Sequence, residues 1–269
     1  MSARPVPPVL SPCLLIDLMS WPFFSLSKSP RHVPVSFAMG RVTMQVSGRD
    51  DSPMATIWDA DILIWAVSRL VAARRRGVPV SPRVQGSMSE VLRFIGRDPA
   101  ATRYERLRTA LDRLHGTQVT TSLRQTRDGA QSFSWLIAWQ ERRGELDLIL
   151  PQWLCDAIGR RGVLTLDPRY FALTGGFERW LYLLVRRHAG RQSDGWAFDL
   201  PHLYRKSASR SPYPRFVFEI RRLIAADTLP GYRLRLETDA SNVPVLRFSP
   251  DPSKETYPQD LVDNHVEDS

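Results

Sequence analysis

A run of six apolar residues at positions 62–67 constrains the fold more than any other feature of the sequence. The run lies inside a predicted helix that starts at Thr56, where Asp59 completes the N-terminal cap. Three arginines at positions 74–76, followed by Gly77, mark the end of this helix. Because the run is apolar on every side of the helix, most faces of the helix must be buried. The chain is therefore expected to fold around it.

The elements expected after this helix follow the order of a helix-turn-helix with a wing. An extended segment at residues 83–85 and a short helix opened by Ser87 come first, and a turn separates them from an amphipathic helix at residues 101–114. Two strands at residues 118–123 and 132–139 then flank an Asp-Gly pair, which is a strong hairpin signal. We interpret this hairpin as the wing.

The same order of elements is predicted a second time. We expect a long helix at residues 177–187, an extended segment at 196–198, a short helix at 201–206, a second helix at 215–226, and two strands at 232–237 and 244–248. The residues themselves are not repeated, only their arrangement. The sequence therefore predicts an α+β fold of two tandem winged-helix domains, each a helix-turn-helix with a β-hairpin wing.

Four segments are expected along the chain. They are a disordered N-terminal segment at residues 1–30, an N-terminal winged-helix domain at 31–143, a C-terminal winged-helix domain at 144–250 and an acidic disordered tail at 251–269. The N-terminal segment is rich in proline, and Met19 is an alternative to Met1 as its first residue. The tail holds six acidic residues and one lysine, without apolar periodicity, so positive charge is concentrated in the folded body.

The net charge of +9 makes nucleic acid the leading partner on charge alone, with anionic membranes and acidic proteins as alternatives. No stretch approaches the ~20 uninterrupted apolar residues of a membrane span. The two cysteines, Cys13 and Cys155, have no metal-ligand spacing and are typical of reduced thiols in a cytoplasmic protein. We therefore expect a cytoplasmic protein that binds nucleic acid.

Four strings of residues resemble those of a known family. They are PFFSLSK at residues 22–28, ATIWDAD at 55–61, LTGGFERWLY at 173–182 and LPGYRL at 229–234. Together and in this order, they make residues 20–250 similar to the replication initiator protein A family of bacterial plasmids. The resemblance implies tandem winged helices that bind repeated origin sequences and help recruit host initiation factors and the replicative helicase. It also implies repression of the protein's own promoter, commonly by a homodimer.

The outward faces of the two amphipathic helices are the expected DNA-binding surfaces, because a winged helix places its second helix in the major groove. The candidate DNA-binding residues are Arg97, Thr102, Arg106, Thr109 and Arg113 in the first half, Arg124 and Arg127 at the hairpin tip, and Lys206, Ser207, Arg210, Arg215 and Arg222 in the second half. For each arginine the alternative is a solvated charge or an intramolecular ion pair, which for Arg113 would involve Glu105 or Asp112. Phe218 falls on the same outward face of its helix.

Catalytic signals are weak. The sequence has no Gly-x-x-x-x-Gly-Lys loop and no His-x-His pair, which disfavours a P-loop ATPase and a metal-dependent nicking initiator. Asp59 and Asp61 are typical of a helix start, and Gly175-Gly176 is more typical of a backbone turn than of a phosphate cradle. We therefore expect a non-enzymatic initiator, without metal or cofactor, that acts on double-stranded plasmid origin DNA. A winged-helix transcriptional regulator or repressor is the alternative, and a nicking or primer-making enzyme is a third hypothesis.

Overall fold

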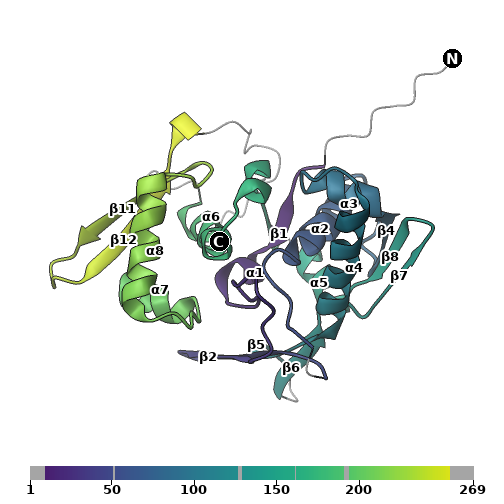
Figure 1. Ribbon diagram of the computed structural model, residues 1–269, viewed down its shortest axis with the longest axis horizontal. Helices are drawn as coiled ribbons and strands as arrows, with labels where there is room; N and C mark the ends of the chain where they lie inside the picture. The colour runs from purple at the N-terminus through teal and green to yellow at the C-terminus, as the bar shows by residue number, and fades with distance from the viewer. Residues whose placement is uncertain (1–9, 51, 127–128, 161, 191–193, 255–269) are drawn as a thin grey trace.

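The computed structural model describes residues 10–50, 52–126, 129–160, 162–190 and 194–254. Within them the protein is a mixed α+β structure with four antiparallel sheets. The first half of the chain lies on one side of the molecule and the second half on the other, with α1 (Ile16–Ser20) and α6 (Gly176–Ala189) between them (Figure 1). The expected α+β class is therefore observed.

The centre of the first half is α2 (Ala60–Arg75), whose apolar run at residues 62–67 is entirely buried, as expected. It contacts β1 (Cys13–Leu15), β4 (Arg83–Ser87), α3 (Met88–Phe94) and α5 (Gln152–Gly159). Residues 56–59 form a turn before this helix. The Thr56 N–H donates to Asp59 Oδ2 at 2.7 Å, and the Asp59 N–H donates to Thr56 Oγ1 at 3.4 Å. The predicted cap is therefore present, one turn ahead of the helix itself.

The order of elements is repeated in the two halves, and so is the pairing of strands. In the first half α2, β4 and α3 precede α4 (Ala101–Gly116), β7 (Ala138–Arg142) and β8 (Glu145–Ile149). The second half has α6, β10 (Trp196–Asp199), α7 (Leu200–Lys206), α8 (Tyr213–Ala226), β11 (Tyr232–Thr238) and β12 (Pro244–Pro250). The strand order is β4-β8-β7 in one sheet and β10-β12-β11 in the other. In each sheet the first strand pairs with the last strand of the hairpin.

The hairpin predicted as the first wing belongs to a different sheet. It is formed by β5 (Thr117–Thr126) and β6 (Gly129–Ser134), and it pairs with β3 (Val42–Gly48), which in turn pairs with β2 (Val35–Met39). The expected single strand at residues 132–139 is divided between β6 and β7. The division falls at Trp135 and Leu136, which are fully buried. Burial of these two side chains turns the chain from one sheet into the next.

The domain boundary expected between residues 143 and 144 is wrong, because it falls inside the hairpin β7–β8. Arg143 (φ 53°) and Gly144 (φ 84°) form the turn of this hairpin, and β8 pairs with β4 of the first half. Leu146 and Leu148 of β8 are buried in the first half's core. The first half therefore continues through α5, which packs on α2.

The N-terminal segment was expected to be disordered, but residues 10–30 are folded into the seam between the halves. The strand β1 contacts α2 and pairs with β9 (Val163–Thr165), while α1 packs on α6. Leu14 and Leu18, which precede the alternative start Met19, are buried, as is Met19 itself. The approach to α6 is close, since a Cβ at Gly176 would lie 2.1 Å from the Leu26 carbonyl oxygen. Glycine is therefore required there by packing.

The remaining elements are two short 3-10 helices, η1 (Pro168–Ala172) and η2 (Pro252–Lys254). Part of the expected acidic tail is therefore folded, because Asp251 is buried and pairs with Arg233 of β11. Residues 1–9 of the expected N-terminal segment and residues 255–269 of the expected tail lie outside the described residues.

A buried ion pair joins the two halves. Asp61 on α2 accepts hydrogen bonds of 2.7 and 2.9 Å from Nη1 of Arg179 on α6, whose side chain is fully buried. The remaining Arg179 donors reach two carbonyl oxygens, Leu173 O from Nε at 2.8 Å and Phe171 O from Nη2 at 3.0 Å. Burial raises the pKa of Asp61 to about 6, although Arg179 opposes this shift. The carboxylate is therefore charged at pH 7.5 and matched to the guanidinium.

Removal of either partner should destabilise the protein strongly. Asp61→Leu or Arg179→Met alone should lower the free energy of unfolding by about 3–5 kcal/mol, because the remaining charge is buried without a partner. The double variant should cost less than the sum of the two single variants. Urea unfolding at pH 7.5 measures all three, with Arg247→Met as a control, because the Arg247–Glu237 pair is exposed and should contribute less than about 1 kcal/mol. Additive costs for the two buried residues would contradict this coupling.

Candidate nucleic-acid interface

The helix α8 presents a cationic face to solvent. Phe216, Ile220 and Leu223 are buried, so the helix has the expected phase. Its outward side carries Arg215 and Arg222, both exposed as predicted. Each forms an ion pair with Glu219 of the same helix, at 2.7 Å from Arg215 and 2.9 Å from Arg222. Exposed pairs of this kind contribute little to stability, so both guanidinium groups can exchange Glu219 for another anion at small cost.

The helix α4 presents a second, separate face. Leu107, Leu111 and Leu114 pack inward. The outward residues Thr102, Arg106 and Thr109 are exposed, as is Arg97 in the turn that precedes the helix, all as expected. The Thr109 hydroxyl donates to the Glu105 carbonyl oxygen at 3.0 Å, and this bond fixes its rotamer. The two helices lie on opposite sides of α1 and α6 (Figure 1).

Arg113 does not belong to this outward face. Its guanidinium donates two hydrogen bonds to Asp59, from Nε at 2.7 Å and from Nη2 at 2.6 Å, in a half-buried position. The hydrogen bond to Asp59 is the main cause that raises the pKa of Arg113. The predicted outward stripe was wrong here because Asp59, 54 positions earlier, lies beside the last turn of α4. Arg113 therefore joins α4 to the start of α2.

Lys206 and Ser207 are also misplaced by the sequence prediction, because both are buried. Lys206 is 6% exposed, and its Nζ lies 4.1 Å from the centroid of the Trp21 ring, in the N-terminal segment. The Ser207 hydroxyl donates to the Tyr204 carbonyl oxygen at 2.7 Å and accepts from the Ser209 N–H at 3.1 Å. Neither side chain is available to DNA in this structure. The two Ser207 hydrogen bonds fix the end of α7.

The hairpin that carries Arg124 and Arg127 is not the one that pairs with β4. The side chain of Arg124 and the whole of Arg127 lie outside the described residues. The hairpin that pairs with β4 is instead β7–β8, and its turn carries Arg142 and Arg143, both exposed. Sequence reasoning missed these two arginines because it assigned β8 to the second half. The Arg-Arg-Gly sequence at the turn was the available signal.

Phe218 lies on the outward face of α8, where the sequence placed it. Its ring is 52% exposed on α8, so the expected phase of this helix was right. The guanidinium carbon of Arg215 lies 4.9 Å from the ring centroid, which indicates a cation–π contact. The outward face of α8 thus combines an aromatic ring with guanidinium groups.

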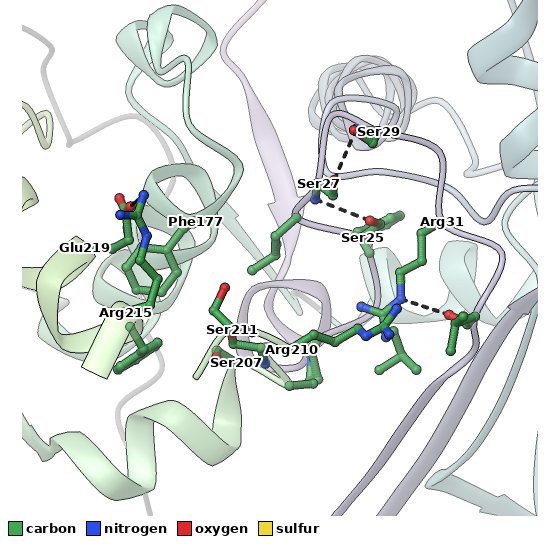
Figure 2. Close-up of a pocket in the computed structure, with 18 of the residues that line it drawn as sticks. Ser25, Ser27, Ser29, Arg31, Phe177, Ser207, Arg210, Ser211, Arg215 and Glu219 are labelled. Atoms are coloured by element: carbon green, nitrogen blue, oxygen red, sulfur yellow. Dashed lines mark hydrogen bonds and ion pairs between the residues drawn. The ribbon is translucent and has the colours of Figure 1, made fainter. Parts of the chain in front are cut away.

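A cavity of about 790 Å³ lies beside the start of α8. One wall is the loop at residues 25–35, which carries Arg31, and the other is the turn around Arg210 together with Arg215 and Glu219 of α8 (Figure 2). Arg210 is exposed, as predicted, and the structure brings it close to Arg31. Sequence reasoning did not single out Arg31, which it placed at the start of the first winged-helix domain, one residue after the segment expected to be disordered.

No group of three or more histidine, cysteine, aspartate or glutamate side chains is arranged to hold a metal ion in the described part of the chain. None of the helices described is both long enough and apolar enough to span a membrane.

The burial of Lys206 has a consequence that depends on pH. Burial, together with the positive charge of Arg187, lowers the pKa of Lys206 to about 8. Between pH 8 and the ordinary pKa of about 10.5, the unfolded chain binds more protons at this position than the folded chain does. The contribution of Lys206 to stability therefore rises with pH across this window, and at pH 7 the buried cation is destabilising.

Lys206→Met should accordingly raise the free energy of unfolding at pH 7 by about 1–3 kcal/mol. The gain should shrink as the pH rises from 8 to 10.5, which urea unfolding at several pH values measures. DNA affinity should stay unchanged, since the ammonium group is covered by Trp21. A uniform loss of affinity for all DNA sequences would show instead that Lys206 contacts phosphates.

Comparison with known proteins places the chain in a family. The sequence model of replication initiator protein A matches residues 16–234. A protein of Wigglesworthia glossinidia brevipalpis, described as a replication protein, is 27% identical over 228 residues. The match covers 81% of this chain and 82% of that protein. Two crystal structures of domains 2 and 3 of RctB have a similar fold. The first has a TM-score of 0.61 at 15% identity, over 85% of this chain and 94% of the RctB chain. The second has a TM-score of 0.56 at 12% identity, over 88% of this chain and 97% of the RctB chain. Because this family match covers most of the chain, the chain belongs to the replication initiator protein A family.

Proposed function

We propose that this protein initiates plasmid replication by binding repeated origin sequences through two winged-helix units. The first unit would comprise α2, β4, α3, α4, β7 and β8, and the second α6, β10, α7, α8, β11 and β12. One observation carries the proposal: apart from the hairpin β5–β6, which is inserted after α4 in the first half, both halves have the same element order and strand pairing, and in both the third helix exposes arginines. Membership of an initiator family supports the role in replication.

In such a unit the second helix of the helix-turn-helix, which is the third helix of the whole unit, enters the major groove, and its outward side chains contact base edges. Arg106 on α4 and Arg215 and Arg222 on α8 would donate bidentately to guanine. Phe218 would lie against the methyl group of a thymine, because that methyl is the apolar feature of the groove. Arg142 and Arg143 at the β7–β8 turn would contact backbone phosphates, which position the protein without reading sequence.

The protein would work without catalysis of its own, in the cytoplasm. Cooperative binding to repeated sites would strain the neighbouring duplex, and the host initiator and replicative helicase would supply the ATP-driven steps. A homodimer would repress the promoter of the gene. The support for these roles is the initiator family together with the cationic faces of α4 and α8.

A minimal plasmid tests the proposed function most directly. A DNA circle carrying only this gene, its neighbouring DNA and a selectable marker should be maintained in a suitable bacterial host. The double variant Arg215→Ala/Arg222→Ala should fail to maintain it, while Arg75→Ala, an exposed arginine at the end of α2, should succeed. If the wild-type circle is lost although the protein binds the neighbouring DNA, the transcriptional repressor is the better assignment.

Single arginine variants should relax specificity at single positions of the site. Arg106→Ala and Arg222→Ala should each cost about 1–3 kcal/mol of binding free energy and remove the preference at one base pair. Fluorescence anisotropy at ~0.15 M salt, near physiological ionic strength, with the site and its single-base variants measures this. Arg113→Ala should instead lower stability, because it breaks the pair with Asp59. Unchanged specificity in both Arg106→Ala and Arg222→Ala would refute the assignment of these faces.

The thymine contact of Phe218 can be tested by changing the DNA and the protein together. Replacement of each thymine by uracil removes only the methyl group. We expect wild-type protein to bind more weakly at one such position, and Phe218→Ala to bind thymine and uracil DNA there equally. A thymine preference that is unchanged in Phe218→Ala would contradict this contact.

A further inference from the structure

The cavity beside α8 has two walls that come from different parts of the chain. One wall is the loop at residues 25–35, which is attached to the first half: the Ser25 N–H donates to Ala55 O at 3.0 Å, and the Met54 N–H donates to Arg31 O at 2.9 Å. The other wall is the turn between α7 and α8 with the start of α8. The cavity therefore exists only when the N-terminal segment is docked against the second half.

Two guanidinium groups meet in this cavity. Figure 2 shows Arg31 and Arg210 extending toward one another from the two walls. Arg31 is held by its own loop, donating from Nε to Val33 O at 2.9 Å and from Nη2 to Pro34 O at 3.3 Å. Burial and the charge of Arg210 lower the pKa of Arg31, which agrees with an unfavourable approach of like charges.

No carboxylate of the described lining residues is paired with Arg31 or Arg210. Among the described residues that line the cavity, Glu219 alone is acidic, and its two oxygens already accept from Arg215 and Arg222. Two like charges at close range are costly unless an anion lies between them. Among the described residues that line it, the cavity thus has an excess of positive charge.

Both loops are fixed by the same pattern of serine hydrogen bonds. In the N-terminal loop the Ser27 N–H donates to Ser25 Oγ at 3.3 Å and the Ser29 N–H donates to Ser27 Oγ at 3.1 Å. In the α7–α8 turn the Ser209 N–H donates to Ser207 Oγ at 3.1 Å and the Ser211 N–H donates to Ser209 Oγ at 3.2 Å. Ordered loops lose little entropy when a ligand binds, which favours affinity.

We propose that Arg31 and Arg210 bind one phosphoryl group between them, and that it is a backbone phosphate of the DNA contacted by α8. Guanidinium groups match the tetrahedral oxygens of phosphate by paired hydrogen bonds. Arg210 lies three residues before the start of α8, so a phosphate bound there would adjoin the groove that α8 enters. The proposal rests on the proposed DNA binding and adds the N-terminal segment to the interface of the second half.

The salt dependence of DNA binding tests this site in the full chain. Loss of one phosphate contact should make the slope of log affinity against log salt concentration less negative by about 0.9. Because both arginines hold the same phosphate, Arg31→Ala, Arg210→Ala and the double variant should all show about this one change, equally for site and non-site DNA. Arg75→Ala should leave the slope unchanged. An unchanged slope in Arg210→Ala, or a double change in the double variant, would overturn the proposal.

A second measurement locates the phosphate and separates it from a free nucleotide. A neutral methylphosphonate at one backbone position should weaken wild-type binding but leave Arg210→Ala binding unaffected. Calorimetric titration of the DNA-free protein with ATP and with inorganic phosphate provides the other arm. Micromolar ATP binding that Arg31→Ala and Arg210→Ala abolish, with the DNA salt slope intact, would make a nucleotide the ligand and overturn the DNA assignment. Failure of the wild-type protein to bind DNA at all would instead contradict the proposed function.

Discussion

One buried ion pair, between Asp61 and Arg179, holds the two halves of the protein together. A guanidinium without solvent contact is tolerated only where every donor is engaged, and Arg179 uses its donors on Asp61 and on two backbone carbonyl groups. The carboxylate comes from the central helix of the first half and the guanidinium from that of the second. The position of α6 against α2 is therefore fixed by polar geometry as well as by apolar packing.

The N-terminal segment fills the seam that this pair creates. It adds β1 to α2 and β9, places α1 on α6, and comes so close to Gly176 that no side chain fits there. Trp21 of the same segment covers Lys206, and the loop carrying Arg31 completes the cavity beside α8. A segment that is remote from α8 in sequence thus determines which cations near α8 are covered and which remain exposed.

Local periodicity was sufficient to predict what each helix does by itself. The burial of residues 62–67, the outward positions of Arg106, Arg215 and Arg222, and the pairing of β11 with β12 all follow from patterns within a few residues. The errors have a common physical cause, which is that the partner lies far away in the sequence. Arg113 is paired with Asp59, Lys206 is covered by Trp21, and β8 pairs with β4. Helical phase and charge contain no information about such partners.

Hydrogen exchange of the native protein, followed by mass spectrometry, tests whether the halves form one cooperative unit. The central amides of α2 and α6 should exchange with the same opening free energy, because the ion pair and the N-terminal segment join the two helices. Arg179→Met should lower that free energy equally in both helices. If α6 opens far more readily than α2 in the wild-type protein, or if Arg179→Met affects only α6, the two halves are independent and the account of the seam is wrong.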